Sequence, residues 1–281
     1  MISFQQVSKQ YALKQPKRTA EKTQSGVHIA LSKVNFSIEE GEKIVLLGGS
    51  GSGKTTLLKM ILRLIDPSEG TICIEGRDHQ SFDLIDLRRK MGYAIQNTGL
   101  FDHMTVKENI TIMLRLLKWE ANAIEKRVKE LLDIARLPSF YLDKYPQELS
   151  GGQGQRVGLA RALAHDPPII LMDEPFAGLD PIIREELQNE CLDLQTKLGK
   201  TMVFVTHDMY EACKMGDRIV VLNEGKLQQI GPPKELISNP KNPFVASFFA
   251  KQSFQLLLMT KRVEHMPLHQ DEPVEFFVPA S

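Results

Sequence analysis

The sequence predicts an α/β fold built on a largely parallel sheet, and two observations carry this prediction. Short apolar runs typical of buried strands alternate with segments of helical spacing; they lie at residues 43–47, 169–172, 201–206 and 218–222. The run 43–47 also leads directly into a glycine-rich stretch at residues 48–55, and a helical pattern follows that stretch. Strands that alternate with helices pack side by side in a parallel sheet.

The composition is that of an ordinary globular protein. Of 281 residues, 42% are hydrophobic and 25% charged, and 35 basic side chains balance 35 acidic ones, so we expect no nucleic-acid partner. The cysteines Cys73, Cys191 and Cys213 form no C-x-x-C pair and are expected to be buried thiols. No apolar run approaches the roughly 18–20 residues that cross a bilayer. We therefore expect a cytosolic protein, unless a partner holds it at a membrane.

The first two predicted strands are expected to form a hairpin. Residues 2–8 and 29–38 alternate as strands do, and the polar stretch 14–26 between them is expected to form an exposed loop. The helical pattern over residues 55–65 is expected to end at the Asp-Pro-Ser-Glu-Gly sequence of residues 66–70.

The middle and the end of the chain differ in pattern. A second strand pair is predicted at residues 71–74 and 91–95, and helical spacing from residue 105 to about 164 predicts an inserted helical lobe. After residue 244 the pattern weakens, and residues 259–281 are expected to form a loosely ordered tail.

The stretch 48–55 matches the phosphate loop G-x-x-x-x-G-K-[ST]. Glycines let the backbone turn tightly enough to aim several N–H groups at phosphate oxygens, and the helix that follows adds its positive end. Lys54 is expected to reach the β- and γ-phosphates and Thr55 to ligate Mg²⁺. The predicted nucleotide contacts in this stretch are Gly48, Gly49, Ser50, Gly51, Ser52, Gly53, Lys54, Thr55 and Thr56.

Polar side chains follow three of the predicted strands. Asp173 and Glu174 end the strand 169–172, where Asp173 is expected to face Mg²⁺ and Glu174 to act as the general base toward the attacking water. Gln96 follows the strand 91–95 and is expected to touch Mg²⁺ and its water. His207 follows the strand 201–206 and is expected to contact the γ-phosphate; the alternative is a strand-end imidazole without a catalytic role.

A second anion site is predicted at residues 150–153. Ser150 is a natural N-cap for a helix that runs to about residue 165, and Gly151 and Gly152 follow it. This segment could serve as a cap alone. Because the chain already has one phosphate loop, we expect the second site to contact the γ-phosphate bound by a neighbouring copy.

Together these motifs resemble the nucleotide-binding subunits of ABC transporters over residues 1–245. The resemblance implies a P-loop NTPase (RecA-like) core with an antiparallel β subdomain and an inserted helical subdomain at about residues 97–165. It also implies ATP and Mg²⁺ as cofactors. It assigns the Walker A motif to residues 48–55, the Walker B aspartate to Asp173 and the catalytic glutamate to Glu174. It assigns the Q-loop to Gln96, the switch histidine to His207, the D-loop to residues 177–180 with Asp180 and the adenine-stacking aromatic to Tyr11. The signature is assigned to Leu149, Ser150, Gly151, Gly152 and Gln153.

A finer resemblance is to the ATPases of glycine betaine, carnitine and choline importers, and it rests on residues 87–93, 96–101 and 103–106. Many of those ATPases carry CBS domains after the catalytic domain, and we expect residues 246–281 to be too short for such a pair. This tail could dock as a helix or be disordered.

The resemblance also implies partners. It predicts a dimer of ATPase subunits, a transmembrane permease gripped near residues 97–106 and an extracytoplasmic solute-binding protein, which places the chain at the cytoplasmic face of the membrane. The alternatives are an ABC ATPase for another cargo, such as an amino acid or a lipid, and a soluble ABC ATPase acting on ribosomes or DNA. A P-loop GTPase is disfavoured because no Asn-Lys-x-Asp motif occurs.

Overall fold

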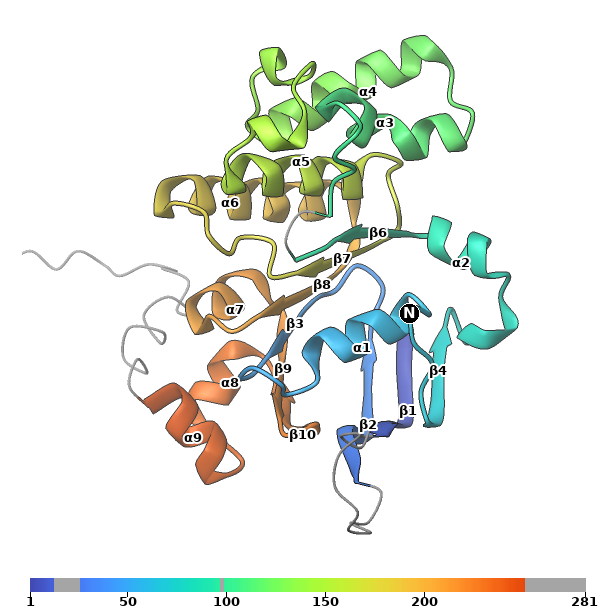
Figure 1. Ribbon diagram of the computed structural model, residues 1–281. Coiled ribbons are helices and arrows are strands. Elements are labelled where there is room, and N and C mark those ends of the chain that lie inside the picture. Colours follow the sequence, from blue (N-terminus) through green and yellow to red (C-terminus); the bar gives the residue numbers. More distant parts are fainter. Residues whose placement is uncertain (13–25, 97–98, 251–281) are drawn as a thin grey trace, which may run out of the picture.

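A six-stranded sheet forms the centre of the molecule. The computed structural model describes residues 1–12, 26–96 and 99–250, drawn in colour in Figure 1. The strand order is β10-β9-β3-β8-β7-β6, and all neighbours are parallel except β10 and β9. The strands are β3 (Lys43–Leu47), β6 (Met91–Ala94), β7 (Ile169–Asp173), β8 (Thr201–Thr206), β9 (Arg218–Asn223) and β10 (Lys226–Gly231). The predicted α/β fold with its largely parallel sheet is confirmed.

Both faces of this sheet are buried. Along β3, Ile44 and Leu46 point into one hydrophobic cluster, and Val45 and Leu47 point into the other. Successive side chains of a strand point to opposite faces, so a strand covered on both sides must be apolar at every position. This is why the central strands appear as continuous apolar runs in the sequence.

A second, antiparallel sheet packs near the first and has the order β2-β1-β4-β5. Its strands are β1 (Ile2–Ala12), β2 (Val27–Ile38), β4 (Glu69–Ile74) and β5 (Arg77–Asp78). The antiparallel β subdomain is thus confirmed, but the predicted pairing of residues 71–74 with residues 91–95 is wrong. Ile72 of β4 lies opposite Phe4 of β1, whereas Met91 of β6 lies beside Ile169 of β7, so the two segments belong to different sheets.

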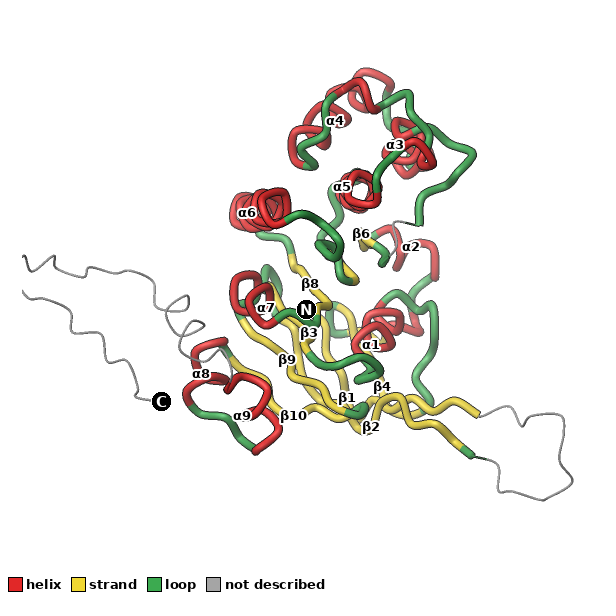
Figure 2. The backbone as a smooth tube through the Cα atoms, turned by 60° about the vertical axis from the view of Figure 1, so that its left-hand side comes forward, coloured by secondary structure: helices red, strands yellow, loops and turns green. Residues whose placement is uncertain are grey.

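Helix α1 (Lys54–Ile61) lies between the two sheets, as Figures 1 and 2 show. It ends earlier than the predicted residue 65. Arg63 adopts a left-handed conformation with φ of 48°, which stops a helix, and its guanidinium donates hydrogen bonds to the carbonyls of His79 and Phe82. These contacts with a distant segment set the end of the helix.

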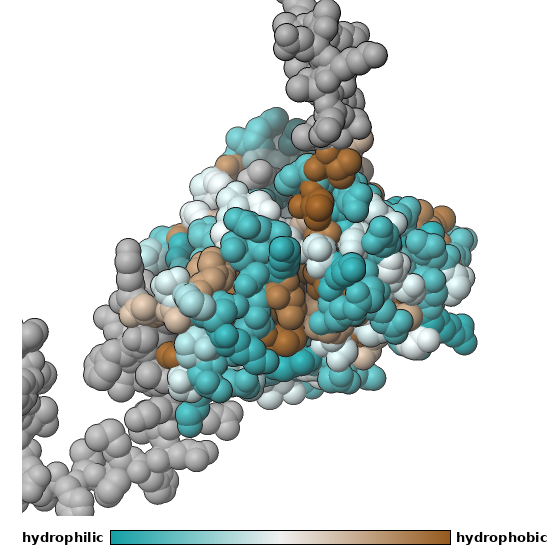
Figure 3. Space-filling model, turned by 90° about the horizontal axis from the view of Figure 1, so that it is seen from below, coloured by the Kyte–Doolittle hydropathy of each residue, from teal (hydrophilic) through white to brown (hydrophobic). Residues whose placement is uncertain are grey.

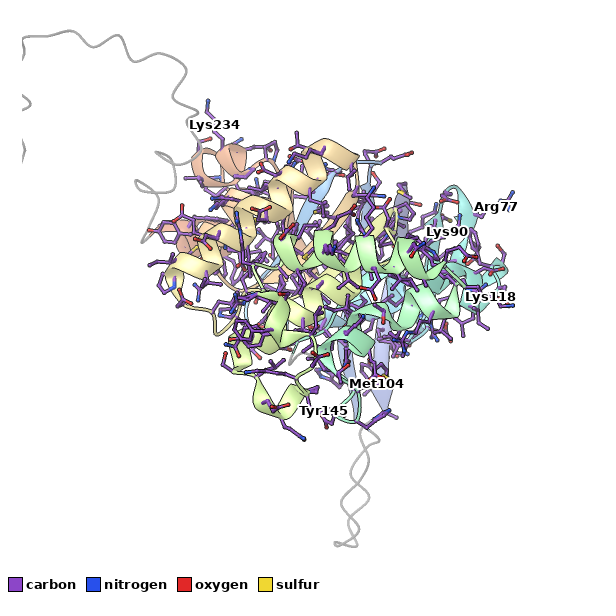
Figure 4. The ribbon with its side chains drawn as sticks, turned by 90° about the horizontal axis from the view of Figure 1, so that it is seen from above. Arg77, Lys90, Met104, Lys118, Tyr145 and Lys234 are labelled. Atoms are coloured by element: carbon purple, nitrogen blue, oxygen red, sulfur yellow. The ribbon has the colours of Figure 1, made fainter. Side chains whose placement is uncertain are left out.

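The predicted helical lobe is present above the sheet (Figure 1). It consists of α3 (Val106–Leu116), α4 (Ala121–Ile134), α5 (Gly151–Leu163) and the short 3₁₀ turns η2 (Ser139–Tyr141) and η3 (Pro146–Glu148). Thr105 and Glu108 form a capping box that fixes the start of α3. Seen from above, Met104 and Tyr145 lie at one end of the lobe and Lys118 at the other (Figure 4).

The remaining helices surround the sheet. They are η1 (His79–Ser81), α2 (Leu84–Arg89), α6 (Pro181–Leu198), α7 (Met209–Met215), α8 (Pro233–Ser238) and α9 (Pro243–Ala250). The weakening predicted after residue 244 is wrong for the first few residues, because α9 buries Val245 and Phe249 against the core. Residues 14–25 of the predicted loop and residues 251–281 of the predicted tail lie outside the described residues.

Among the described residues, no helix is long and apolar enough to cross a membrane. The face seen from below is mainly hydrophilic, with small separate apolar patches (Figure 3). Scattered apolar side chains of this kind are normal on a folded surface.

Candidate nucleotide site

The predicted phosphate loop joins β3 to α1, and two of its glycines are required by the space around them. Gly53 precedes α1 with φ of 100°, and a Cβ there would lie 2.5 Å from the Leu31 side chain. A Cβ on Gly48 would lie 2.3 Å from the Leu222 carbonyl oxygen. The loop therefore folds against β2 and β9 in a shape that side chains at these two positions would prevent.

Lys54 is held inside the loop. Its ammonium donates hydrogen bonds of 2.8 Å each to the carbonyls of Gly48 and Gly49. Burial lowers the pKa of Lys54, while the nearby carboxylates of Glu174 and Asp173 oppose that shift. The loop thus positions a cation where it can meet phosphate oxygens.

Thr55 and Asp173 meet at the base of the loop. The Thr55 hydroxyl donates a hydrogen bond of 3.0 Å to Oδ1 of Asp173, which is only 2% exposed at the end of β7. A hydroxyl and a carboxylate are hard oxygen ligands, and Mg²⁺ at nucleotide sites uses one or two protein oxygens together with phosphates and water. The two side chains fit the predicted metal site.

The three predicted catalytic side chains are brought together at the carboxyl ends of β6, β7 and β8. Glu174 Oε1 lies 3.2 Å from Nδ1 of His207, and the Gln96 amide donates a 3.3 Å hydrogen bond to Glu174 Oε2. Glu174 also has a left-handed backbone with φ of 48°, which it shares with several turn residues of the described chain, such as Glu75. Gln96, predicted to touch a metal ion, contacts the carboxylate of Glu174 here.

Tyr11 lines a pocket together with the phosphate loop, and its contact with the base stays a prediction. This pocket of about 200 Å³ is bounded by Tyr11, His28 and Ala30 on the hairpin and by residues 51–56. His28 was missed by sequence reasoning. It lies directly opposite Tyr11 in the β1–β2 register, a pairing that becomes visible only once the hairpin is aligned.

The other predicted contacts form a separate group. Ser150 caps α5 by accepting a hydrogen bond from the Gln153 backbone, and the Gln153 side chain returns to the Ser150 backbone and donates to the Tyr141 hydroxyl. Asp180 caps α6 by accepting from the Ile183 backbone. None of Ser150, Gly151, Gly152, Gln153 and Asp180 lines the described pockets that contain the phosphate loop or Glu174.

This second group is nevertheless compact. A Cβ on Gly152 would lie 3.0 Å from the side chain of Leu179, the residue before Asp180. The first turn of α5 therefore packs against the loop that leads into α6. The predicted site residues thus divide into two clusters within one chain.

A family model described as "ABC transporter" matches residues 31–177. The chain is 48% identical over 267 residues to the glycine betaine/carnitine/choline transport ATP-binding protein OpuCA of Bacillus subtilis, covering 95% of this chain and 67% of that protein. It is 48% identical to the osmoprotectant import ATP-binding protein OsmV of Salmonella typhimurium, covering 88% of this chain and 63% of that one.

A solved structure is also similar. The ATP-binding cassette MJ0796, in a dimeric post-hydrolysis state bound to ADP and Pi, superposes with a TM-score of 0.73 at 34% identity and covers 83% of this chain and 98% of that chain. The chain spans 67% of the first relative, 63% of the second, and 58% to 61% of related carnitine and choline transport ATP-binding proteins.

We expect Asp173→Asn to raise the thermal stability of the nucleotide-free protein by a few degrees at neutral pH. Burial raises the pKa of Asp173 above its ordinary value of 3.8, although the Thr55 hydroxyl opposes the shift. A carboxyl with a raised folded pKa contributes stability that falls as pH rises through that pKa. Asparagine keeps the oxygen that Thr55 bonds but removes the charge.

The measurement is thermal unfolding between pH 3.5 and pH 8, with the exposed cap substitution Asp180→Asn as the control. Asparagine caps a helix as well as aspartate, so the control should unfold like the wild type. The advantage of Asp173→Asn should vanish at the acid end. Equal stability of variant and wild type at neutral pH would contradict a destabilising carboxylate.

Proposed function

The chain belongs to the ABC transporter family of ATP-binding proteins, and from that premise we propose that it binds and hydrolyses ATP to energise uptake of a small osmoprotectant such as glycine betaine or choline. The activity is supported by the family match together with the phosphate loop and the acidic cluster beside it. The cargo is supported by the relatives, whose names specify transport of these solutes.

One observation carries the proposal: none of the residues 150–153 lines the pockets that contain the phosphate loop or Glu174, so the site residues form two clusters. Lys54, Thr55, Asp173 and Glu174 surround the phosphate loop, whereas Ser150 starts a helix elsewhere on the molecule. A helix N-terminus binds anions through its free N–H groups. Two copies facing each other would complete two sites, each between one copy's phosphate loop and the other's Ser150 segment.

The proposed chemistry assigns a role to each side chain of the first cluster. Lys54 would contact the β- and γ-phosphates in place of its loop carbonyls. Thr55 and Asp173 would hold Mg²⁺, which when bound would supply positive charge against the phosphate oxygens. Glu174 accepts the proton of the attacking water, and His207 orients that water against the γ-phosphate. Gln96 connects Glu174 to the helical lobe, because its side chain hydrogen-bonds Glu174 and its backbone precedes the lobe.

A groove on the helical lobe suits a permease. Its volume is about 630 Å³, and it lies between α2, β6, α3 and α5. Ile85 and Leu116 at its rim are 62% and 64% exposed, and Arg88 and Arg89 add positive charge. An amphipathic helix from a membrane protein could bury its apolar face here.

The groove overlaps the docking stretch predicted at residues 97–106 only in part. Gly99 and Phe101 line it, and residues 97 and 98 lie outside the described residues. We propose that a permease binds this groove on the cytoplasmic face of the membrane. An extracytoplasmic solute-binding protein would deliver the cargo.

Uptake of labelled solute tests the whole proposal. Cells that express the cognate permease and binding protein would be compared with and without this chain, using radiolabelled glycine betaine, choline and sulfate. We expect uptake of betaine or choline that requires the chain and its Lys54. Uptake of sulfate alone would mean that the proposed cargo is wrong. Uptake of all three solutes without the chain would refute its role in transport.

We expect Glu174→Gln to bind ATP, to hydrolyse it at least about 100-fold more slowly and to accumulate as a closed dimer. The variant keeps the size of the side chain but cannot accept a proton. Hydrolysis is measured by phosphate release and dimerisation by gel filtration with ATP. The control is Glu75→Gln, a turn residue that shares the left-handed backbone with φ of 53°. Normal hydrolysis by a monomeric Glu174→Gln would contradict the assignment.

We expect Ser150→Arg to abolish ATP turnover while the monomer still binds nucleotide normally. The bulky cation would obstruct the contact with the partner's nucleotide, but it lies outside the chain's own phosphate loop. Equilibrium binding of a fluorescent ATP analogue at low protein concentration measures the monomer, and Ser150→Thr serves as the cap-preserving control. A large loss of monomer affinity would argue against a role in the partner's site.

A further inference from the structure

A small polar cavity lies behind the predicted catalytic residues. It has a volume of about 140 Å³, and Glu174, Gly178 and His207 line it together with Arg184 and Glu211. The first three belong to the loops that meet at the carboxyl ends of β7 and β8. Arg184 and Glu211 come from helices α6 and α7, and sequence reasoning assigned neither of them a role.

Glu211 connects these helices to the end of β8. It lies in the first turn of α7 and accepts a 3.2 Å hydrogen bond from the amide of Gln188 on α6. The Thr206 hydroxyl also hydrogen-bonds the carboxylate, and Thr206 is the residue directly before His207. The carboxylate therefore fixes α7, α6 and the strand that carries His207 in one arrangement.

The Glu211 carboxyl is buried, so it depends on its hydrogen-bond partners. Burial raises the pKa of Glu211, whereas the hydrogen bonds from Thr206 and Gln188 and the positive charge of Arg184 oppose that shift. A buried polar group that loses its partners costs free energy, so the donors and the carboxylate hold one another in place. Asp208, at the cap of α7, is the nearby like charge.

Arg184 extends the same contacts to the loop of residues 177–180. Its guanidinium donates a 3.1 Å hydrogen bond to the carbonyl of Leu179, next to Asp180. Gln188 lies further along the same helix and is 6% exposed. The two loops that flank Glu174 are thus joined through α6 and α7.

We infer that Glu211 is a positioning residue for ATP hydrolysis, which holds His207 and the loop 177–180 in register with Glu174 through Gln188, Thr206 and Arg184. This inference rests on the proposed function. His207 is mostly exposed and contacts Glu174 at 3.2 Å, so the direction of its ring depends on where the end of β8 and the start of α7 are held. Displacement of a catalytic group by about 1 Å can cost up to about 100-fold in rate.

Three substitutions in the full chain test the inference. Glu211→Ala and Gln188→Leu each break the contact from one side, and both should lower kcat by about 10- to 100-fold with KM for ATP little changed. Gln195→Leu is the matched control. Gln195 is also buried on α6, but it hydrogen-bonds Gly41 and Lys43 at the amino end of β3. This substitution should lower the melting temperature and leave kcat unchanged.

Two further comparisons separate positioning from general destabilisation. Glu211→Gln keeps the size and most of the hydrogen bonds, so it should recover most of kcat. Because Glu211→Ala already removes the contact with Gln188, adding Gln188→Leu to it should lower kcat little further. If Glu211→Ala fails to fold, the test is the comparison of kcat between Gln188→Leu and Gln195→Leu.

Wild-type kcat in both Glu211→Ala and Gln188→Leu would overturn the inference and leave the proposed function intact. So would equal losses of kcat in Gln188→Leu and Gln195→Leu. A wild-type chain that does not hydrolyse ATP would refute the proposed function, and the inference with it. Loss of kcat in the two variants alone, with recovery in Glu211→Gln, supports both.

Discussion

The burial of opposite charges beside one glycine loop is the constraint on which the rest of the structure depends. Lys54 is 6% exposed and Asp173 is 2% exposed, and burial shifts the pKa of each toward its neutral form. Neutral groups hold both, namely the carbonyls of the loop for Lys54 and the Thr55 hydroxyl for Asp173. Such groups are costly to bury unless a ligand completes their interactions. The proposed triphosphate and divalent cation would supply the missing charges, which accounts for polar side chains at the ends of strands that are buried on both faces.

The proposed site, which is complete only across two chains, would couple chemistry to motion. The loop side supplies Lys54 and Glu174, while Ser150 is fixed at the start of α5 by a capping box with Gln153. That box is built within the chain, so the second half-site is preformed before any partner arrives. Closure then requires rotation of whole elements and little local folding. In the proposed dimer, loss of the γ-phosphate would remove the group that both halves contact and would let the pair open.

Much of this arrangement follows from local sequence, and the predictions that were wrong failed for physical reasons. The strand Lys43–Leu47, the acids Asp173 and Glu174 at the end of β7 and the Ser150 cap depend on neighbouring residues, and their positions were predicted correctly. The pairing of β4 and β6 was predicted wrongly, because apolar alternation does not specify a partner strand. Helix α1 stops early through contacts of Arg63 with His79 and Phe82, which no local pattern reveals. The positions of His28 and Glu211 likewise depend on tertiary packing. The site roles themselves remain predictions that the described substitutions would test.

Two of the elements that line the groove also lead to the two half-sites, so they connect the proposed permease site to the proposed ATP site. Strand β6 contributes Tyr93 to the groove and leads to Gln96, which bonds Glu174. Helix α5 contributes Ala162 near its end and presents Ser150 at its start. The two elements pack closely, because a Cβ on Gly92 would lie 2.1 Å from the Ala162 carbonyl oxygen. A permease helix bound in the groove would therefore contact both the strand that leads to Gln96 and the helix that begins beside Ser150.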